Sequence, residues 1–132
     1  MSDFTDYTEN NIVNWMVGGV DMPVSHGNVY VALHTGDPTE TGDSNEVSAA
    51  SYARASTTAG TDWNINGGSF ENSSDIGFTD ATETWGDISH FSLWDSETGG
   101  NAIAYSNLTT TRTVQDGDAP IFRSQSLTGV VD

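Results

Sequence analysis

Turn-forming residues interrupt this chain at short intervals from residue 35 onward, so no element there can be long. Clusters of Gly, Asp, Asn and Ser separate brief runs that are rich in Val, Ile, Thr and aromatic side chains. Such runs are typical of β-strands, and turns of this composition join antiparallel neighbours. Helical patterns that alternate with strands, as in a doubly wound α/β fold, are missing. The sequence therefore predicts a mainly β fold, an antiparallel β-sandwich of jelly-roll-like type.

The clearest strand is expected over residues 28–34, where both alternating faces are apolar enough for a central position in a sheet. Residues 35–48 are dense in Gly, Pro, Asp, Thr and Ser and are expected to form a long loop. Residues 88–95 and 102–108 flank a Gly-Gly turn and are expected to pair as a hairpin. Further short strands are expected at residues 50–57, 61–72 (a hairpin around Gly67 and Gly68), 76–79, 121–122 and 127–131.

One helix is expected, over residues 5–18. Asp6 and Glu9 stand three positions apart, as an N-cap residue and its acidic partner do. Apolar residues follow at helical spacing, and Gly18 with Gly19 ends the run. The apolar stripe contains Trp15 and has to be covered, either by the domain itself or by a neighbouring subunit. We expect one domain over residues 1–132, with the helix at its start and the sandwich over residues 28–132.

The charge of the chain is strongly unbalanced, with 19 acidic residues, three basic residues and a net charge of −16. All three basic residues are arginines. Carboxylates at this density repel one another in dilute buffer, whereas in molar salt the screening length falls to ~3 Å. The composition therefore predicts a protein from a high-salt, halophilic environment. It argues against nucleic acid and anionic membranes as partners, because both require clustered Lys and Arg.

The N-terminal segment is acidic and does not resemble a Sec-type signal peptide. No run approaches the ~18 apolar residues that a membrane-spanning helix needs. We therefore expect the mature protein to begin near Met1 and to be assembled inside the host cell.

Catalytic residue sets are not evident. Cysteine is absent, which excludes thiolate chemistry and cysteine–zinc sites. His26, His34 and His90 have no partners at a metal-ligand spacing such as H-E-x-x-H, so we expect hydrogen-bonded structural histidines. His34 could contact Asp37. Neither a nucleophile elbow nor a phosphate-binding glycine loop is present, and the chain is expected not to be an enzyme.

No cofactor and no metal are expected. With 19 acids in 132 residues, some carboxylates always lie near one another, so such pairs carry no signal for glycoside hydrolysis. The acids near Asp37, and those at Asp116 and Asp118, could at most hold a cation weakly.

Arginines and tryptophans are the candidates for subunit contacts. In so acidic a chain each arginine is expected to have a carboxylate partner, within the subunit or across an interface. Trp94 is expected in the core, whereas Trp15 and Trp85 could be core residues or interface anchors. Trp63 or Trp85 could also provide a stacking platform in a glycan-binding module. The predicted interface residues are Trp15, Met16, Trp85, Arg54, Arg112 and Arg123.

Several motifs along nearly the whole chain resemble a family of small structural proteins of tailed viruses, often labelled tail-fibre or minor virion proteins. The combination of YVALHT-x-DPT with WG-x-ISHF is the most specific part of the resemblance. The motifs are EN-x-I-x-NW (residues 9–15), YVALHT-x-DPT (30–39), EVS (46–48), YAR (52–54), WG-x-ISHF-x-L-x-D (85–95), TGGN (98–101), LT-x-x-RTV-x-x-GD (108–118) and a closing LT (127–128).

The resemblance implies a virion component without catalysis, here a halophilic archaeal virus version. A short chain without coiled-coil, collagen or β-helix repeats is poorly suited to a fibre. We therefore expect a capsid decoration or vertex (turret or tower) protein, a homo-oligomer that contacts the major capsid protein or other virion proteins. A tail, baseplate or tail-fibre subunit is the alternative within the same class, and a glycan-binding module is the alternative outside it.

Overall fold

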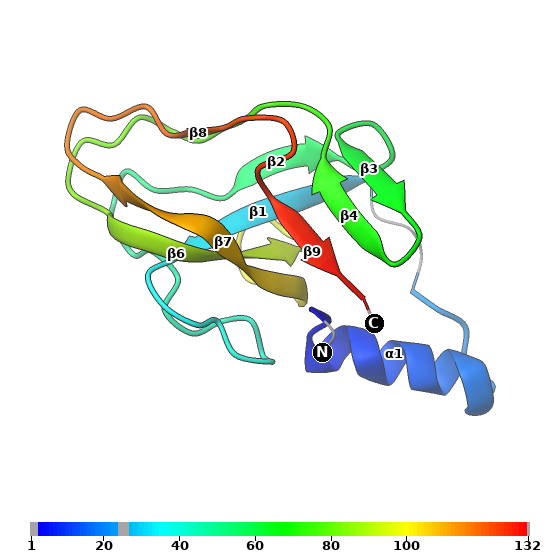
Figure 1. Ribbon diagram of the computed structural model, residues 1–132. Coiled ribbons are helices and arrows are strands. Elements are labelled where there is room, and N and C mark those ends of the chain that lie inside the picture. The colour runs from blue at the N-terminus through cyan, green and yellow to red at the C-terminus, as the bar shows by residue number, and fades with distance from the viewer. Residues whose placement is uncertain (1–2, 24–26, 132) are drawn as a thin grey trace.

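A four-stranded antiparallel sheet forms one layer of the fold in the computed structural model, which describes residues 3–23 and 27–131. Its strand order is β2-β1-β6-β7 (Figure 1). The strands are β1 (Asn28–His34), β2 (Ala55–Thr58), β6 (Gly86–Trp94) and β7 (Ala102–Val114). The predicted central position of β1 is confirmed, because β1 pairs with β2 on one side and β6 on the other.

The second layer is made of two smaller antiparallel sheets. Their strands are β3 (Trp63–Asn66), β4 (Ser69–Asn72) and β9 (Thr128–Val130), and β5 (Ile76–Gly77) with β8 (Ile121–Phe122). The predicted hairpin around Gly67 and Gly68 joins β3 to β4. Gly67 has φ +64°, a conformation that a two-residue hairpin loop requires and that glycine adopts without strain.

The core fills the space between the two layers. Phe91, Leu33 and Ile88 of the large sheet are fully buried there, together with Leu127 and Phe122 from the second layer. Each such side chain contributes roughly 1.5–3 kcal/mol to folding by leaving water. The predicted mainly β sandwich with one N-terminal helix is confirmed.

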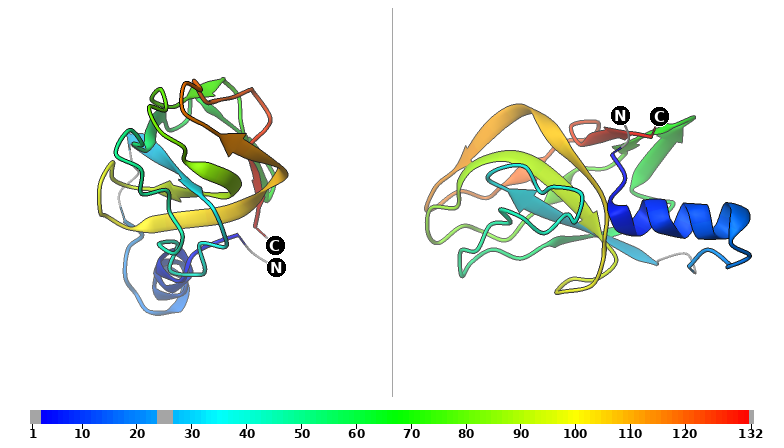
Figure 2. Two further views of the ribbon diagram at one scale, coloured as in Figure 1. Left: turned by 90° about the vertical axis from the view of Figure 1, so that its left-hand side faces the viewer. Right: turned by 90° about the horizontal axis from the view of Figure 1, so that it is seen from below.

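The helix α1 (Asp6–Val17) lies outside the sandwich. Its first turn touches β7, and its far end extends beyond the ends of the strands (Figure 2). The N-cap residue is Thr5, not Asp6 as predicted from the spacing of the acids. The reason is that the Thr5 hydroxyl accepts the N–H of Thr8, while Asp6 and Glu9 occupy the first turn of the helix.

The strand boundaries differ most from the prediction at β2 and β7. β2 begins only at Ala55, because the backbone N–H groups of Ser51 and Tyr52 donate to the Glu83 carboxylate and to the carbonyl of Ala49 and are not free to pair. β7 continues six residues past Leu108, through polar and mostly exposed threonines that give no alternating apolar pattern. Within the part of the chain that the structure describes, no helix is long and apolar enough to cross a membrane.

Candidate assembly surface

The base of α1 is fixed to the edge of the large sheet. Thr5 Oγ1 donates to the carbonyl of Ala102, and Thr8 Oγ1 donates to the carbonyl of Ile103 at 2.7 Å. Phe4 forms an isolated antiparallel bridge with Ala104. Thr5 and Thr8 are both buried, so these bonds form away from water. The sequence therefore sets the direction of the helix through two threonines, which the apolar pattern did not indicate.

The far half of α1 is exposed and apolar. Val13, Trp15, Met16 and Val17 have 54%, 58%, 62% and 80% of their surfaces exposed. No charged residue occurs from Asn10 to Val20. The helix ends at Val17 and is capped by Gly18, whose N–H donates to the carbonyl of Asn14 at 2.9 Å. Contiguous apolar surface of this kind is typical of a contact with another molecule.

The predicted interface residues differ in how much of each side chain is exposed. Trp15 and Met16 lie on the uncovered part of α1, so they are available to a neighbour. Trp85 is 5% exposed, its indole N–H donates to Ser51 Oγ at 2.9 Å, and its ring meets Tyr52 edge to face. Trp85 is therefore a core residue, which is one of the two positions predicted for it. Its indole is not available as an interface anchor or a glycan platform.

Trp63 is half-buried rather than freely exposed. Its indole N–H donates to Thr57 Oγ1 at 2.9 Å, and its ring packs edge to face against Phe70. Trp94 is buried, as predicted, on the opposite face of the large sheet from the main core, beside Ala32 and Ala102.

Arg54 has its carboxylate partner within the subunit. The guanidinium lies 3.8 Å from the centroid of the Trp94 ring, and its Nη2 is 2.9 Å from Glu46 Oε1. The side chain of Arg54 is only 8% exposed, so in the isolated subunit it serves this cluster rather than a surface. The Tyr52 hydroxyl completes the cluster by donating to Glu46 Oε2 at 2.7 Å.

The titration of this cluster reflects its burial. Burial would raise the pKa of Glu46, but the hydrogen bonds from Arg54 and Tyr52 outweigh it, and the net pKa lies below the usual value. Burial, with the Glu46 charge nearby, raises the pKa of the Tyr52 phenol far above its usual range. The cluster therefore holds a fixed charge pair and a neutral phenol throughout the physiological range.

The other two arginines are exposed. Arg123 Nη1 is 2.9 Å from Asp75 Oδ2, so it too has a carboxylate partner within the subunit. The Asp75 carboxylate also accepts the Ser124 N–H, and these bonds lower its pKa. Arg112 lies over the ring of Phe122, 5.1 Å from its centroid. Arg112 and Arg123 remain accessible to a neighbouring subunit.

His34 is a hydrogen-bonded structural histidine, as predicted. It is fully buried, with Nδ1 2.8 Å from the carbonyl of Ser44 and Nε2 2.7 Å from Ser92 Oγ. Nδ1 donates to the carbonyl, so Nε2 accepts the hydroxyl, and the Trp94 indole N–H bonds the same Ser92 oxygen. The proposed contact with Asp37 is wrong, because the ring is bonded to these serines instead.

The other histidines and acids that the sequence indicated as candidates lie at separate positions in the chain. His90 Nδ1 is bonded to Ser89 Oγ, and His26 lies outside the described residues. Asp37 accepts the N–H of Thr39, and Asp118 accepts the N–H of Gln115, each closing its own turn. Among residues 3–23 and 27–131, no group of three or more His, Cys, Asp or Glu side chains is placed to hold a metal ion.

The motif residues that are separated in the sequence meet in the fold. The EVS and YAR segments supply Glu46 and Arg54, and Nη1 of Arg54 donates to the carbonyl of Gly99 in TGGN. YVALHT and ISHF-x-L meet where β1 pairs with β6. The motifs therefore hold the long loop of residues 35–48 and the β6–β7 turn against the large sheet, which is a structural role.

The described residues form a small β-sandwich whose N-terminal helix has an exposed apolar half. The chain belongs to the family described as podophage GP4 fiber I protein gp80, whose model matches residues 3–129. This match supports the tailed-virus resemblance and identifies a structural, fibre-like virion protein. It fits the tail-fibre alternative at least as well as the expected capsid decoration. No curated protein matches the chain.

Proposed function

We propose that this chain is a non-catalytic building block of a fibre on a tailed virus particle, and that it assembles as a homo-oligomer. The observation that carries the proposal is the exposed apolar half of α1. The family to which the chain belongs is described as a podophage fiber protein, which agrees with this role. A structural subunit needs such a surface, because its role is to be held by neighbours. The hydrogen-bonded network around His34 and Arg54 joins the long loop of residues 35–48 to the large sheet and the β6–β7 turn.

A capsid decoration or vertex protein is the second candidate. A two-layered sandwich without a fibrous repeat is the observation that favours it. In that case the neighbours are the major capsid protein or other head proteins. A tail or baseplate position would use the same surface, and neither nucleic acid nor membrane is a partner in any of these arrangements.

We also propose a high-salt host, a halophilic archaeon, from the charge of −16 and the absence of lysine. Assembly then takes place in the host cytoplasm, where salt screens the carboxylates of neighbouring subunits. No specific metal or cofactor is required for this role.

Quantitative mass spectrometry of purified particles, followed by separation of heads from tails, tests the function. A fibre subunit is expected in a few dozen copies or fewer, in one fraction. Hundreds of copies on isolated heads would instead identify a capsid decoration protein, since shell symmetry multiplies such subunits. Absence from washed particles would contradict both candidates.

A further inference from the structure

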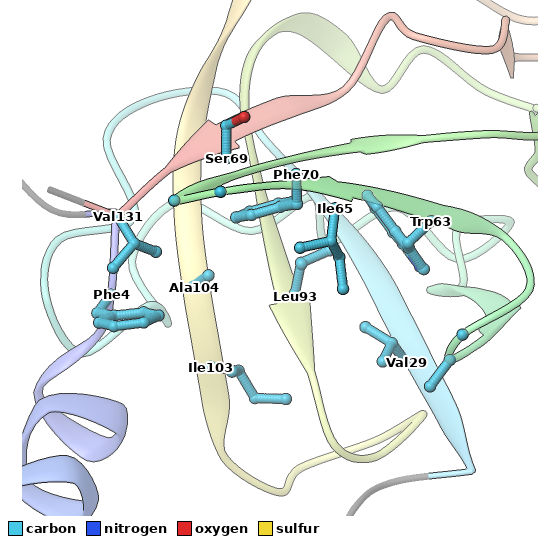
Figure 3. Close-up of a pocket in the computed structure, with 14 residues that line it drawn as sticks. Phe4, Val29, Trp63, Ile65, Ser69, Phe70, Leu93, Ile103, Ala104 and Val131 are labelled. Atoms are coloured by element: carbon cyan, nitrogen blue, oxygen red, sulfur yellow. The ribbon is translucent and has the colours of Figure 1, made fainter.

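A second apolar surface lies on the sandwich, apart from α1. It is a groove of about 470 Å³ between the β3–β4 hairpin and the large sheet (Figure 3). Trp63, Ile65 and Phe70 form one side, and Val29 and Ile103 form the other. None of the described residues that line the groove is charged, and Ile65 at its rim is 78% exposed.

The two apolar surfaces are alike in their lack of charge. In a chain with 19 acidic residues, most contacts between copies bring carboxylates together. The far half of α1 and the described residues that line the groove include no charged side chain, so copies can meet there without burying an unpaired carboxylate of those residues. This electrostatic match favours a second copy of the chain as the occupant of the groove.

The position of α1 is compatible with a contact to the groove of a second copy. Thr5 and Thr8 fix its base on β7, and the 12-residue helix is about 18 Å long. Its apolar end lies beyond the strands and can reach a neighbour (Figure 2). No residue of α1 lines the groove of its own chain.

We propose that the far half of α1 of one copy docks into the apolar groove of the next copy. Trp15 and Met16 supply the inserted side chains, and Ile65 and Phe70 receive them. The contact joins two different patches, so it is heterologous and produces a ring when it closes or a filament when it does not. The inference rests on the proposed structural function and names the partner, a second copy, and its contact.

Complementation of two defective variants tests this docking. Trp15→Glu introduces a charge on the apolar half of α1 and leaves the groove unchanged. Ile65→Glu introduces a charge in the groove and leaves α1 unchanged. Both side chains are more than half exposed, so neither substitution disturbs the core. The control is Ile121→Glu, which introduces the same charge at an exposed isoleucine on β8, outside the groove. Circular dichroism confirms that each variant is folded, and the mass in solution is measured by light scattering in high salt.

The wild type and Ile121→Glu are expected to form rings or filaments, whereas each of the other variants alone is expected to be a 14.0 kDa monomer. An equal mixture of Trp15→Glu and Ile65→Glu should form a pair, because one chain keeps a groove and the other keeps a helix. The pair cannot extend. A monomeric wild type, an unaffected Ile65→Glu variant or a mixture that stays monomeric would each overturn the docking. None of these results depends on where the chain lies in the particle. An oligomeric wild type with an unaffected Ile65→Glu variant would overturn the docking alone, whereas a monomeric wild type would also contradict the proposed homo-oligomer.

Discussion

Arg54 and Glu46 meet at two points: Nε and Nη2 of the guanidinium donate to the two carboxylate oxygens, each at 2.9 Å. Nη1 of the same arginine donates to the carbonyls of Ser96 and Gly99. One side chain therefore ties together the end of the long loop, the β6–β7 turn and, through stacking, Trp94. Lysine cannot reproduce this planar arrangement of donors.

Loss of Arg54 is expected to be strongly destabilising. Arg54→Met leaves the half-buried Glu46 carboxylate without its partner, which costs roughly 3–5 kcal/mol in the free energy of unfolding. Replacing both residues, with Glu46→Leu added, should regain part of that loss, because no buried charge then remains unpaired. Denaturant unfolding measures both. Equal stability of Arg54→Met and the wild type would contradict the role given to this pair.

Arg123→Met is the matched control for that experiment. Its ion pair with Asp75 has the same 2.9 Å distance, but the side chains are 72% and 43% exposed. Solvent screens such a pair, so a much smaller change in unfolding free energy is expected.

Stability is expected to fall with acidification below pH 6.5 because of His34. Burial is the main cause that lowers the pKa of His34 from its usual 6.5, so the unfolded chain binds a proton at higher pH than the folded chain does. The stabilising contribution is therefore complete above pH 6.5 and is lost as the pH falls through the folded pKa. Thermal unfolding of His34→Gln should show lower stability at neutral pH, with a flatter dependence just below 6.5. A slope equal to that of the wild type would contradict the assignment.

A second acid transition is expected from Glu46. Its pKa is lowered, so its contribution is present above its usual 4.5 and is lost only as the pH falls below that value. The two transitions are separated in pH. Glu46→Gln should weaken the lower one, to which Asp75 also contributes, and leave the upper one in place.

Stability is expected to increase with salt. Raising the KCl concentration from dilute buffer to the molar range shortens the screening length to ~3 Å and removes repulsion among the carboxylates. A rising melting temperature is the expected result. A variant in which exposed carboxylates become amides (Asp21→Asn, Asp80→Asn, Glu97→Gln) should respond less steeply. A melting temperature that falls with KCl would contradict the high-salt proposal.

Repulsion at the base of α1 gives a local version of the same test. The neighbouring carboxylates of Asp6 and Glu9 raise the pKa of Glu40. Glu40→Gln should therefore raise the melting temperature in dilute buffer and leave it unchanged in molar salt, where the repulsion is already screened. An identical gain at both salt concentrations would mean that the effect is not electrostatic.

The sequence predicted the strands well where burial leaves a regular pattern. β1 and β6 alternate apolar residues, and their bounds were found closely. The extension of β7 could not be predicted, because Thr109 to Thr111 face water and carry no periodicity. The layer of each strand could not be predicted either, since it depends on contacts between distant residues.

The candidate site was predicted in part. The apolar stripe with Trp15 and Met16 was recognisable from its spacing, but only the structure shows that the sandwich leaves it uncovered. The groove was missed because Val29, Trp63 and Ile103 come from three separate strands. Trp85 could be assigned to the core only once Ser51 and Tyr52 were seen around it.

The most direct test of the account is a reconstruction of intact particles by cryo-electron microscopy, at a resolution that shows side chains. The sandwich should fit density in a virion appendage or on the shell, and the Trp15 face of α1 should be covered by a neighbouring subunit. Particles in which the sandwich is present but α1 projects into solvent, contacting nothing, would contradict the central claim that this helix holds the subunit in its assembly.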